Sequence, residues 1–262
     1  MDIRTNNNHP EREITPMEIH IIRHGQSANN AVMEKPGMRV EDPELTETGW
    51  EQARQTAAFL ANGSNLEDLV RRPIHAPERR QPHPYQFTHL YTSPMHRTLQ
   101  TTQPIAQKLG LRPEVWVDLH EHGGIYLERD GVVTGFGGLT RAQMQQHFPD
   151  YMLPATITDA GWWNVDSGQE NIAGAYARAI TVALALKERA TRPEHQHDRI
   201  ILVAHGTFID CLLKAFVGAA PREGYYHWLY NASLTRLDII DSGAIIMRYT
   251  NRIHHLPPEL VT

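Results

Sequence analysis

The sequence has little of what defines several other classes of protein. Its 262 residues include one cysteine, Cys211, so the chain can form neither an internal disulfide nor a cysteine-rich zinc site. No apolar run approaches the roughly 18 residues that are needed to cross a membrane. Residues 1–16 are polar and lack the apolar segment of a secretory signal, which predicts a cytoplasmic protein with a flexible N-terminal tail.

Charged residues of both signs are dispersed along the chain. There are 25 Lys and Arg against 30 Asp and Glu, a formal net charge of −5, without a basic block. This argues against nucleic acid as a partner, because nucleic-acid-binding proteins carry a concentrated basic surface. It leaves a small anionic substrate open, since a few well-placed arginines bind a phosphate group. The length is compatible with a single domain, which we place at residues 17–262.

Apolar runs of strand length alternate with segments of helical periodicity. Residues 17–23, 87–92 and 199–204 are rich in β-branched and apolar side chains, which predicts three buried strands. Shorter strands are predicted at 115–119, 233–240 and 244–249. The predicted helices are 48–61 (capped by Thr46 or Thr48), the segment from Ser93-Pro94 to Leu109, 140–147, 171–190 and 206–217.

Three local details accompany these elements. Ser93 and Pro94 are predicted to be the N-cap and the first-turn proline of their helix. Residues 71–86, rich in Arg, Pro and His, predict an exposed loop. Apolar side chains four residues apart predict the packing stripe of the 171–190 helix, and they are Ile172, Tyr176, Ile180 and Leu184.

The alternation of strands and helices is typical of an α/β fold. We expect a three-layer α/β/α sandwich with a mostly parallel central sheet. The Gly-rich segment at about 122–166 predicts a small cap, whose aromatic side chains, among them Trp162 and Trp163, either pack inside it or line the substrate entrance. Ligands of such folds bind beyond the carboxyl ends of the strands.

Reactive side chains follow three of the predicted strands. Arg23 and His24 come at the end of the first, Arg97 lies one turn beyond the second, and His205 ends the third. Each histidine is followed by a glycine, which lets backbone approach a ligand closely. A neutral histidine is a competent nucleophile, and arginine binds phosphate oxygens in a bidentate manner. The pattern therefore indicates phosphoryl transfer without a metal ion or other cofactor.

Four ordered segments resemble motifs of the histidine phosphatase, or phosphoglycerate mutase-like, superfamily. They are RHGQSANN (23–30), LTETGWEQA (45–53), TSPMHRTLQTT (92–102) and VAHGTFI (203–209). The resemblance implies that His24 accepts the phosphoryl group and that Arg23, Arg97 and His205 take part in catalysis. It also implies a phosphate pocket formed by Arg23, Ser27, Asn30, Arg97, His205 and Gly206.

The same resemblance implies an acid at Glu121, which would protonate the leaving oxygen and then activate water. The sequence after Glu121 is longer and richer in glycine than the family pattern, and Gln26 stands where many members have Glu. His120 and His122 flank Glu121 and could be read as a metal cluster. Zinc sites need three protein ligands in fixed geometry, so we expect no metal.

The resulting hypothesis is a phosphatase that hydrolyses a small phosphomonoester through a phosphohistidine on His24. A cofactor-dependent phosphoglycerate mutase is the alternative, disfavoured because the segment after Glu121 has few basic residues. An inactive protein that binds phosphorylated ligands is a third hypothesis. Residues 225–228 are aromatic and offer either internal packing or a contact between two copies in a homodimer. No membrane partner is expected.

Overall fold

The computed structural model describes residues 16–32, 35–63, 84–219, 224–240 and 242–262. The predicted tail, apart from Pro16, and residues 71–83 of the predicted loop lie outside these ranges. Within them, no helix combines the length and the apolar character that crossing a bilayer requires.

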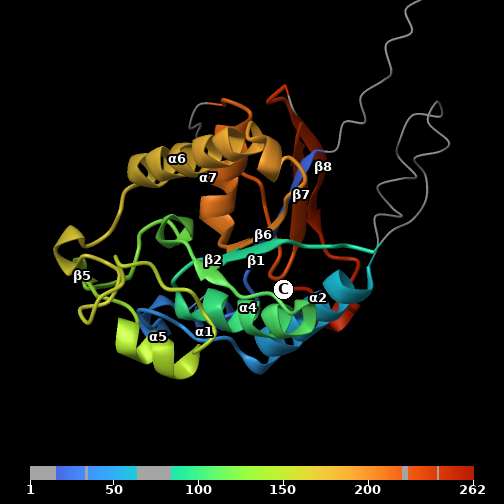
Figure 1. Ribbon diagram of the computed structural model, residues 1–262. Coiled ribbons are helices and arrows are strands. Elements are labelled where there is room, and N and C mark those ends of the chain that lie inside the picture. Colours follow the sequence, from blue (N-terminus) through green and yellow to red (C-terminus); the bar gives the residue numbers. More distant parts are fainter. Residues whose placement is uncertain (1–15, 33–34, 64–83, 220–223, 241) are drawn as a thin grey trace, which may run out of the picture.

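A six-stranded sheet forms the centre of the fold, in the order β3-β2-β6-β1-β7-β8 (Figure 1). Strands β3, β2, β6 and β1 run parallel to one another. Strand β7 runs antiparallel to β1, and β8 runs antiparallel to β7. The predicted mostly parallel sheet is confirmed. The strands are β1 (Met17–Arg23), β2 (His89–Thr92), β3 (Glu114–Val115), β6 (Arg199–Ala204), β7 (Leu234–Ile239) and β8 (Ile245–Arg252).

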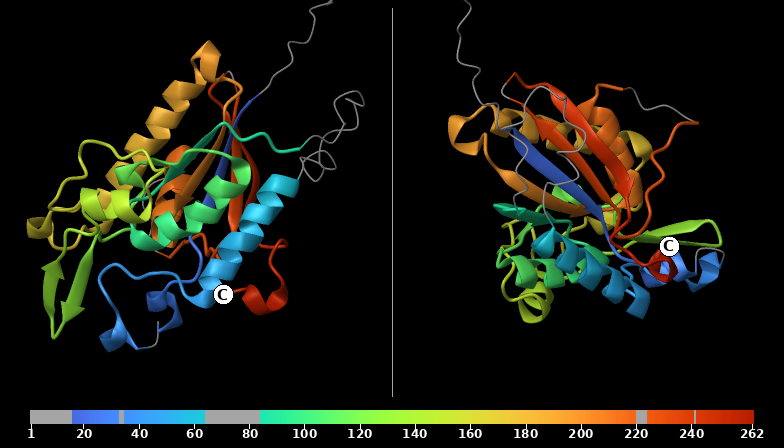
Figure 2. Two further views of the ribbon diagram at one scale, coloured as in Figure 1. Left: turned by 60° about the horizontal axis from the view of Figure 1, so that its bottom comes forward. Right: turned by 90° about the vertical axis from the view of Figure 1, so that its right-hand side faces the viewer.

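Helices cover both faces of this sheet, as the views in Figure 2 show. Because side chains alternate along a strand, β1 contributes to two cores. Ile19 and Ile21 pack under α6 (Ile172–Ala190) and α7 (Gly206–Phe216). Ile22 packs under α2 (Glu47–Asn62) and α4 (His96–Leu109). The predicted three-layer sandwich is therefore confirmed.

The cap is built from residues between the strand β3 and the helix α6. It contains a hairpin of β4 (Tyr126–Arg129) and β5 (Val132–Gly135), followed by α5 (Arg141–His147). Its apolar side chains, Met144 and Trp162 among them, form a third core with residues of the main body such as Leu99. Of these cap elements, the sequence predicted α5 and missed the hairpin.

Two predicted elements have different boundaries in the structure. Ser93 is not the N-cap of α4; the cap residue is Met95, which makes no side-chain capping hydrogen bond. The hydroxyl of Ser93 is instead 2.7 Å from Nε2 of His205. The predicted strand 115–119 is also wrong, because β3 ends at Val115 and the chain turns into a 3₁₀ helix over Val117–Leu119.

The predicted packing stripe of α6 is largely wrong. Ile180 and Leu184 are 41% and 59% exposed, and of the predicted stripe Tyr176 is buried. The buried face of α6 is rich in alanine at the same four-residue spacing, and small side chains let α6 pack closely on its neighbour α7. This face consists of Ala175, Tyr176, Ala179, Val182, Ala183, Leu186 and Ala190.

Of the two threonines proposed to cap α2, the structure selects Thr46. Its hydroxyl accepts a hydrogen bond from the Gly49 N–H at 3.1 Å. Thr48 lies inside the first turn. We expect Thr46→Ala to lower the free energy of unfolding by about 1 kcal/mol, the usual cost of a lost cap. Urea unfolding measures this, with Thr48→Ala as the control that should lose less; an equal loss in both variants would contradict the assignment.

Candidate active site

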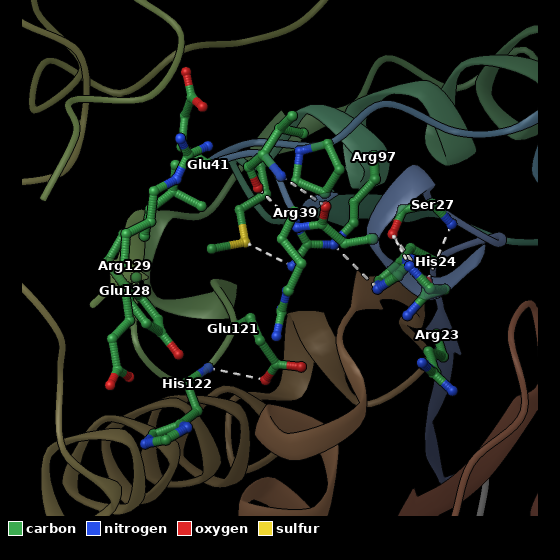
Figure 3. Close-up of a pocket in the computed structure, with 18 of the residues that line it drawn as sticks. Arg23, His24, Ser27, Arg39, Glu41, Arg97, Glu121, His122, Glu128 and Arg129 are labelled. Atoms are coloured by element: carbon green, nitrogen blue, oxygen red, sulfur yellow. Dashed lines mark hydrogen bonds between the residues drawn. The ribbon is translucent and has the colours of Figure 1, made fainter. Parts of the chain in front are cut away.

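Strands β1, β6 and β2 end side by side. A pocket of about 460 Å³ opens next to their ends (Figure 3). The register pairs Arg23 with Ala204, and Thr92 with Val203. His24, Ser93 and His205 therefore follow directly at one edge, as predicted. Of the predicted site residues, those lining the pocket are Arg23, His24, Ser27, Asn30, Arg97 and Glu121.

The partners of His24 fix its protonation. Its Nδ1 is 2.7 Å from the carbonyl oxygen of Gly25, which can only accept, so Nδ1 carries the proton. Nε of Arg97 donates to Nε2 of His24 at 3.1 Å, so Nε2 has its lone pair. Burial, reinforced by Arg97 and Arg23, holds the pKa of His24 well below 6.5. The ring is neutral at neutral pH, with Nε2 available as a nucleophile.

Two arginines lie next to this ring. Arg97, in the first turn of α4, is 8% exposed, and its Nη2 contacts Sδ of Met95 at 3.1 Å. Arg23 is held by a hydrogen bond from its Nη1 to the carbonyl oxygen of Leu229. Nε of Arg23 is buried and has no hydrogen-bond partner among the described residues. A free buried donor in a pocket is suited to an anionic ligand, because leaving it unpaired is costly.

His205 lies beneath His24 rather than on the pocket wall. The ring centroids are 5.1 Å apart, and His205 is fully buried. Burial, with Arg97 and His24 next in effect, keeps the pKa of His205 well below 6.5. Its Nε2 meets Ser93, while Nδ1 has no partner within the described part of the chain.

Glu121 reaches the pocket from the segment after β3. Its carboxylate accepts hydrogen bonds from the backbone N–H groups of Thr207 (3.2 Å) and Phe208 (2.9 Å) at the start of α7. The N–H of His122 adds a third at 2.8 Å. N–H groups at a helix N-terminus have no partner within the helix, and here they hold both carboxyl oxygens, so α7 fixes the position of Glu121 in the pocket.

Ser27 and Asn30 line the pocket and also bond each other. Ser27 caps the short helix α1 (Ala28–Ala31), and its hydroxyl is 3.0 Å from Oδ1 of Asn30. The sequence did not predict Asn231, whose Nδ2 donates to the carbonyl oxygen of His24 (3.0 Å) and to Asn30 (3.3 Å). No sequence motif marks Asn231, which reaches the site because β7 pairs with β1.

The glycines after the two histidines serve contacts within the protein. A Cβ at Gly25 would lie 2.5 Å from the carbonyl oxygen of Gly49, so the missing side chain lets this loop meet α2. A Cβ at Gly206 would lie 3.4 Å from Nε of Arg23. The expectation that Gly25 makes room for a ligand is thus corrected: the close approach is to backbone of the same chain.

The outer wall of the pocket contains side chains that were not among the predicted site residues. Arg39 comes from the loop before α2, and Glu128 and Arg129 come from the hairpin (Figure 3). Asp130 and Gly131, which join β4 to β5, both have positive φ, of 52° and 76°. An Asp-Gly pair between two β-prone runs is a strong hairpin signal, and it could have located this wall.

The histidines that flank Glu121 lie in different surroundings. His120 is buried between Trp162 and Trp163, and burial lowers its pKa to about 3. His122 lines the pocket. Among the described residues, no group of three side chains is placed to hold a metal ion. His255 packs on Phe59 and lies 3.0 Å from the hydroxyl of Thr56.

The chain matches the family model of the histidine phosphatase superfamily (branch 1) over residues 19–70 and 63–252. These matches cover most of the sequence, so the chain belongs to this superfamily. Phosphoglycerate mutase-like protein 4 of Arabidopsis thaliana is 23% identical over 239 residues, 91% of this chain and 86% of that protein. Three mycobacterial relatives are longer, and the chain spans 56% of their length.

Solved structures share the fold. A phosphoserine phosphatase from Entamoeba histolytica, in complex with 3-phosphoglyceric acid, aligns with a TM-score of 0.56 at 18% identity, covering 92% of this chain and 100% of that one. A mycobacterial glucosyl-3-phosphoglycerate phosphatase complexed with VO3 aligns with a TM-score of 0.52 at 23% identity, covering 90% and 100%. At these identities the likeness establishes the architecture.

The hydrogen bonds of His24 predict its tautomer. We expect the proton on Nδ1, with Nε2 unprotonated, throughout neutral pH and into the acid range below 6.5, because burial and two arginines oppose a second proton. Long-range ¹H–¹⁵N spectra of histidine-labelled protein report the tautomer, with His24→Ala providing the assignment. A proton on Nε2 at neutral pH would contradict the arrangement.

Proposed function

We propose that this chain is a phosphatase that hydrolyses small phosphomonoesters through a phosphohistidine on His24. The observation that carries the proposal is the neutral His24 ring, whose Nε2 faces a pocket next to the guanidinium groups of Arg23 and Arg97. Phosphoryl transfer depends mainly on positioning and charge neutralisation, and two arginines supply both.

In the first step, Nε2 of His24 attacks phosphorus and forms the N–P bond. The phosphorus replaces the N–H of Arg97 as the partner of Nε2. Arg97 then directs its N–H groups to the phosphoryl oxygens. The P–O bond to the substrate alcohol breaks, and the leaving oxygen takes a proton from Glu121. The proton on Nδ1 stays on the ring, held by the carbonyl oxygen of Gly25.

In the second step, a water molecule attacks the phosphorus of the phosphohistidine. The N–P bond breaks, His24 returns to its neutral form, and Glu121 takes the proton that the water loses. Inorganic phosphate leaves the pocket. Glu121 thus returns to its protonated state, and one water is consumed for each ester hydrolysed.

The named activities of the structural neighbours, on phosphoserine and on glucosyl-3-phosphoglycerate, support a small phosphorylated substrate. A mutase would return the phosphoryl group to an acceptor instead of water. Among the described cap residues that line the pocket, Arg129 is the one arginine or lysine, and this gives little support to that route. An inactive binding protein would have no need of Nε2 held free of a proton.

Replacing His24 tests the covalent route. We expect wild-type protein to release phosphate from members of a phosphomonoester panel in the presence of EDTA, and His24→Ala to release none. Acid-labile, base-stable phosphate on wild-type protein, quenched during turnover, would identify the phosphohistidine.

The matched control is His197→Ala, an exposed histidine far along the chain, which should behave as wild type. Phosphate release that persists in His24→Ala would overturn the mechanism. Transfer to 3-phosphoglycerate from a bisphosphate primer, without net phosphate release, would select the mutase.

The role of Glu121 predicts a dependence on the leaving group. We expect Glu121→Gln to slow hydrolysis of alkyl phosphates by about 10²–10⁴-fold, because an alkoxide needs a proton as it leaves. p-Nitrophenyl phosphate, whose leaving group is a stable anion, should be affected far less. Glu128→Gln, a carboxylate on the hairpin side of the same pocket, should leave the ratio of the two rates unchanged. Equal losses on both substrates would exclude an acid role.

A further inference from the structure

The carboxylate of Asp42 lies behind Arg97, outside the pocket lining. Its side chain is 10% exposed, and Oδ1 accepts the backbone N–H of His96 at 3.0 Å. The same oxygen is 3.9 Å from Nη1 of Arg97. Oδ2 is buried without a hydrogen-bond partner in the described part of the chain. Oδ1 of Asp42 is thus bound to the start of α4, and Oδ2 can still accept a hydrogen bond.

Asp42 completes the surroundings of the Arg97 guanidinium. Nε of Arg97 donates to His24, Nη2 contacts Met95, and Nη1 is the nitrogen nearest to Asp42. The orientation of Nε towards His24 therefore depends on what holds the other two nitrogens. A carboxylate at 3.9 Å attracts Nη1 by charge, which the thioether of Met95 cannot do.

The loop that carries Asp42 is anchored to the same helix as Arg97. The Leu45 N–H donates to Oε1 of Gln100 at 2.7 Å, and Pro43 is buried. Together with the bond to His96, these contacts fix the position of Asp42 relative to α4.

Four groups set the charge state of this carboxylate. Burial raises the pKa of Asp42 to about 6, and the neighbouring acids Glu41 and Glu44 act in the same direction. Arg97 and the hydrogen bond from His96, both on α4, oppose the increase. The His96 ring, nearby on the same helix, has its pKa lowered by burial.

We propose that Asp42 is a positioning residue that holds Arg97 against His24 and competes with a bound phosphate group for the Arg97 guanidinium. Both anions approach the same cation from different sides. When Asp42 is uncharged, it no longer offsets the positive charge of Arg97, and Arg97 attracts an anion in the pocket more strongly. By thermodynamic reciprocity, anion binding then increases the proton affinity of Asp42. The inference rests on the proposed function in taking this pocket as the phosphate site.

The test uses sulfate, whose charge does not change over the relevant pH range, and measures its dissociation constant by calorimetry between about pH 5 and pH 8. Asp42→Asn keeps an oxygen for the His96 N–H and removes the charge. At about pH 8 we expect this variant to bind sulfate about tenfold more tightly than wild type does. A tenfold change in affinity is the equivalent of a shift of one pKa unit. At about pH 5, where Asp42 of the wild type is largely uncharged, the two proteins should have similar dissociation constants for sulfate.

The matched control is Glu47→Gln, an exposed acid at the start of α2 that is not among the groups acting on Asp42, and it should retain the wild-type pH dependence. Any pH dependence left in Asp42→Asn belongs to other groups, such as the pocket histidines. Equal sulfate affinity in wild type and Asp42→Asn at high pH, or weaker binding in the variant, overturns the proposal.

A second measurement needs no variant and covers the case in which Asp42→Asn does not fold. Calorimetry of wild-type protein near pH 6, in two buffers of different ionisation enthalpy, counts the protons taken up with sulfate. Uptake is expected, and its absence overturns the proposal. Phosphate release by wild-type protein tests the proposed function separately, so an active enzyme whose sulfate affinity is indifferent to Asp42 overturns this inference alone.

Discussion

The contact between Arg97 and His24 sets the conditions for the rest of the site. Burial disfavours the protonated ring of His24, and the buried arginine beside it adds to this, because two adjacent positive charges in a low-dielectric setting repel each other. The Gly25 carbonyl then determines which nitrogen keeps the remaining proton. Burial, charge and hydrogen bonding together thus give a neutral ring with an unprotonated Nε2, and Ser93 meets His205 beneath it.

The parallel sheet brings this arrangement together. Strands β1, β2 and β6 end in register, so residues far apart in the sequence meet at one edge, and close backbone approach between Gly25 and Gly49 seats α2 against the loop of His24. Glu121 arrives from outside the sheet and is fixed by the N–H groups of α7, the helix that begins directly after His205.

Elements with one consistent pattern could be predicted from the sequence, and elements with two competing patterns could not. The apolar runs at 17–23 and 199–204 allow one reading, a buried strand, and the convergence of Arg23, His24 and His205 follows from it. On α6, alanines and larger side chains both recur every four residues, and contact with α7 decides which set is buried. Contacts between residues that are far apart in the sequence also limit prediction.

Ser93 illustrates that limit. Its hydroxyl could cap a helix or meet His205, which is 112 positions away, and local sequence contains no information on the second option. Asp42 was overlooked for the same reason, since its importance comes from burial behind Arg97. The hairpin was missed although its Asp-Gly turn was present in the sequence.

The strand β1, which carries His24 at its end, is paired on both sides, by β6 and by β7. Its backbone has no free edge along which to shift, so His24 follows a strand that is held from both sides. The opposite wall of the pocket is a two-stranded hairpin that pairs only within itself among the described strands. The length and side chains of that hairpin can therefore change without altering the strand pairs that hold His24 in place.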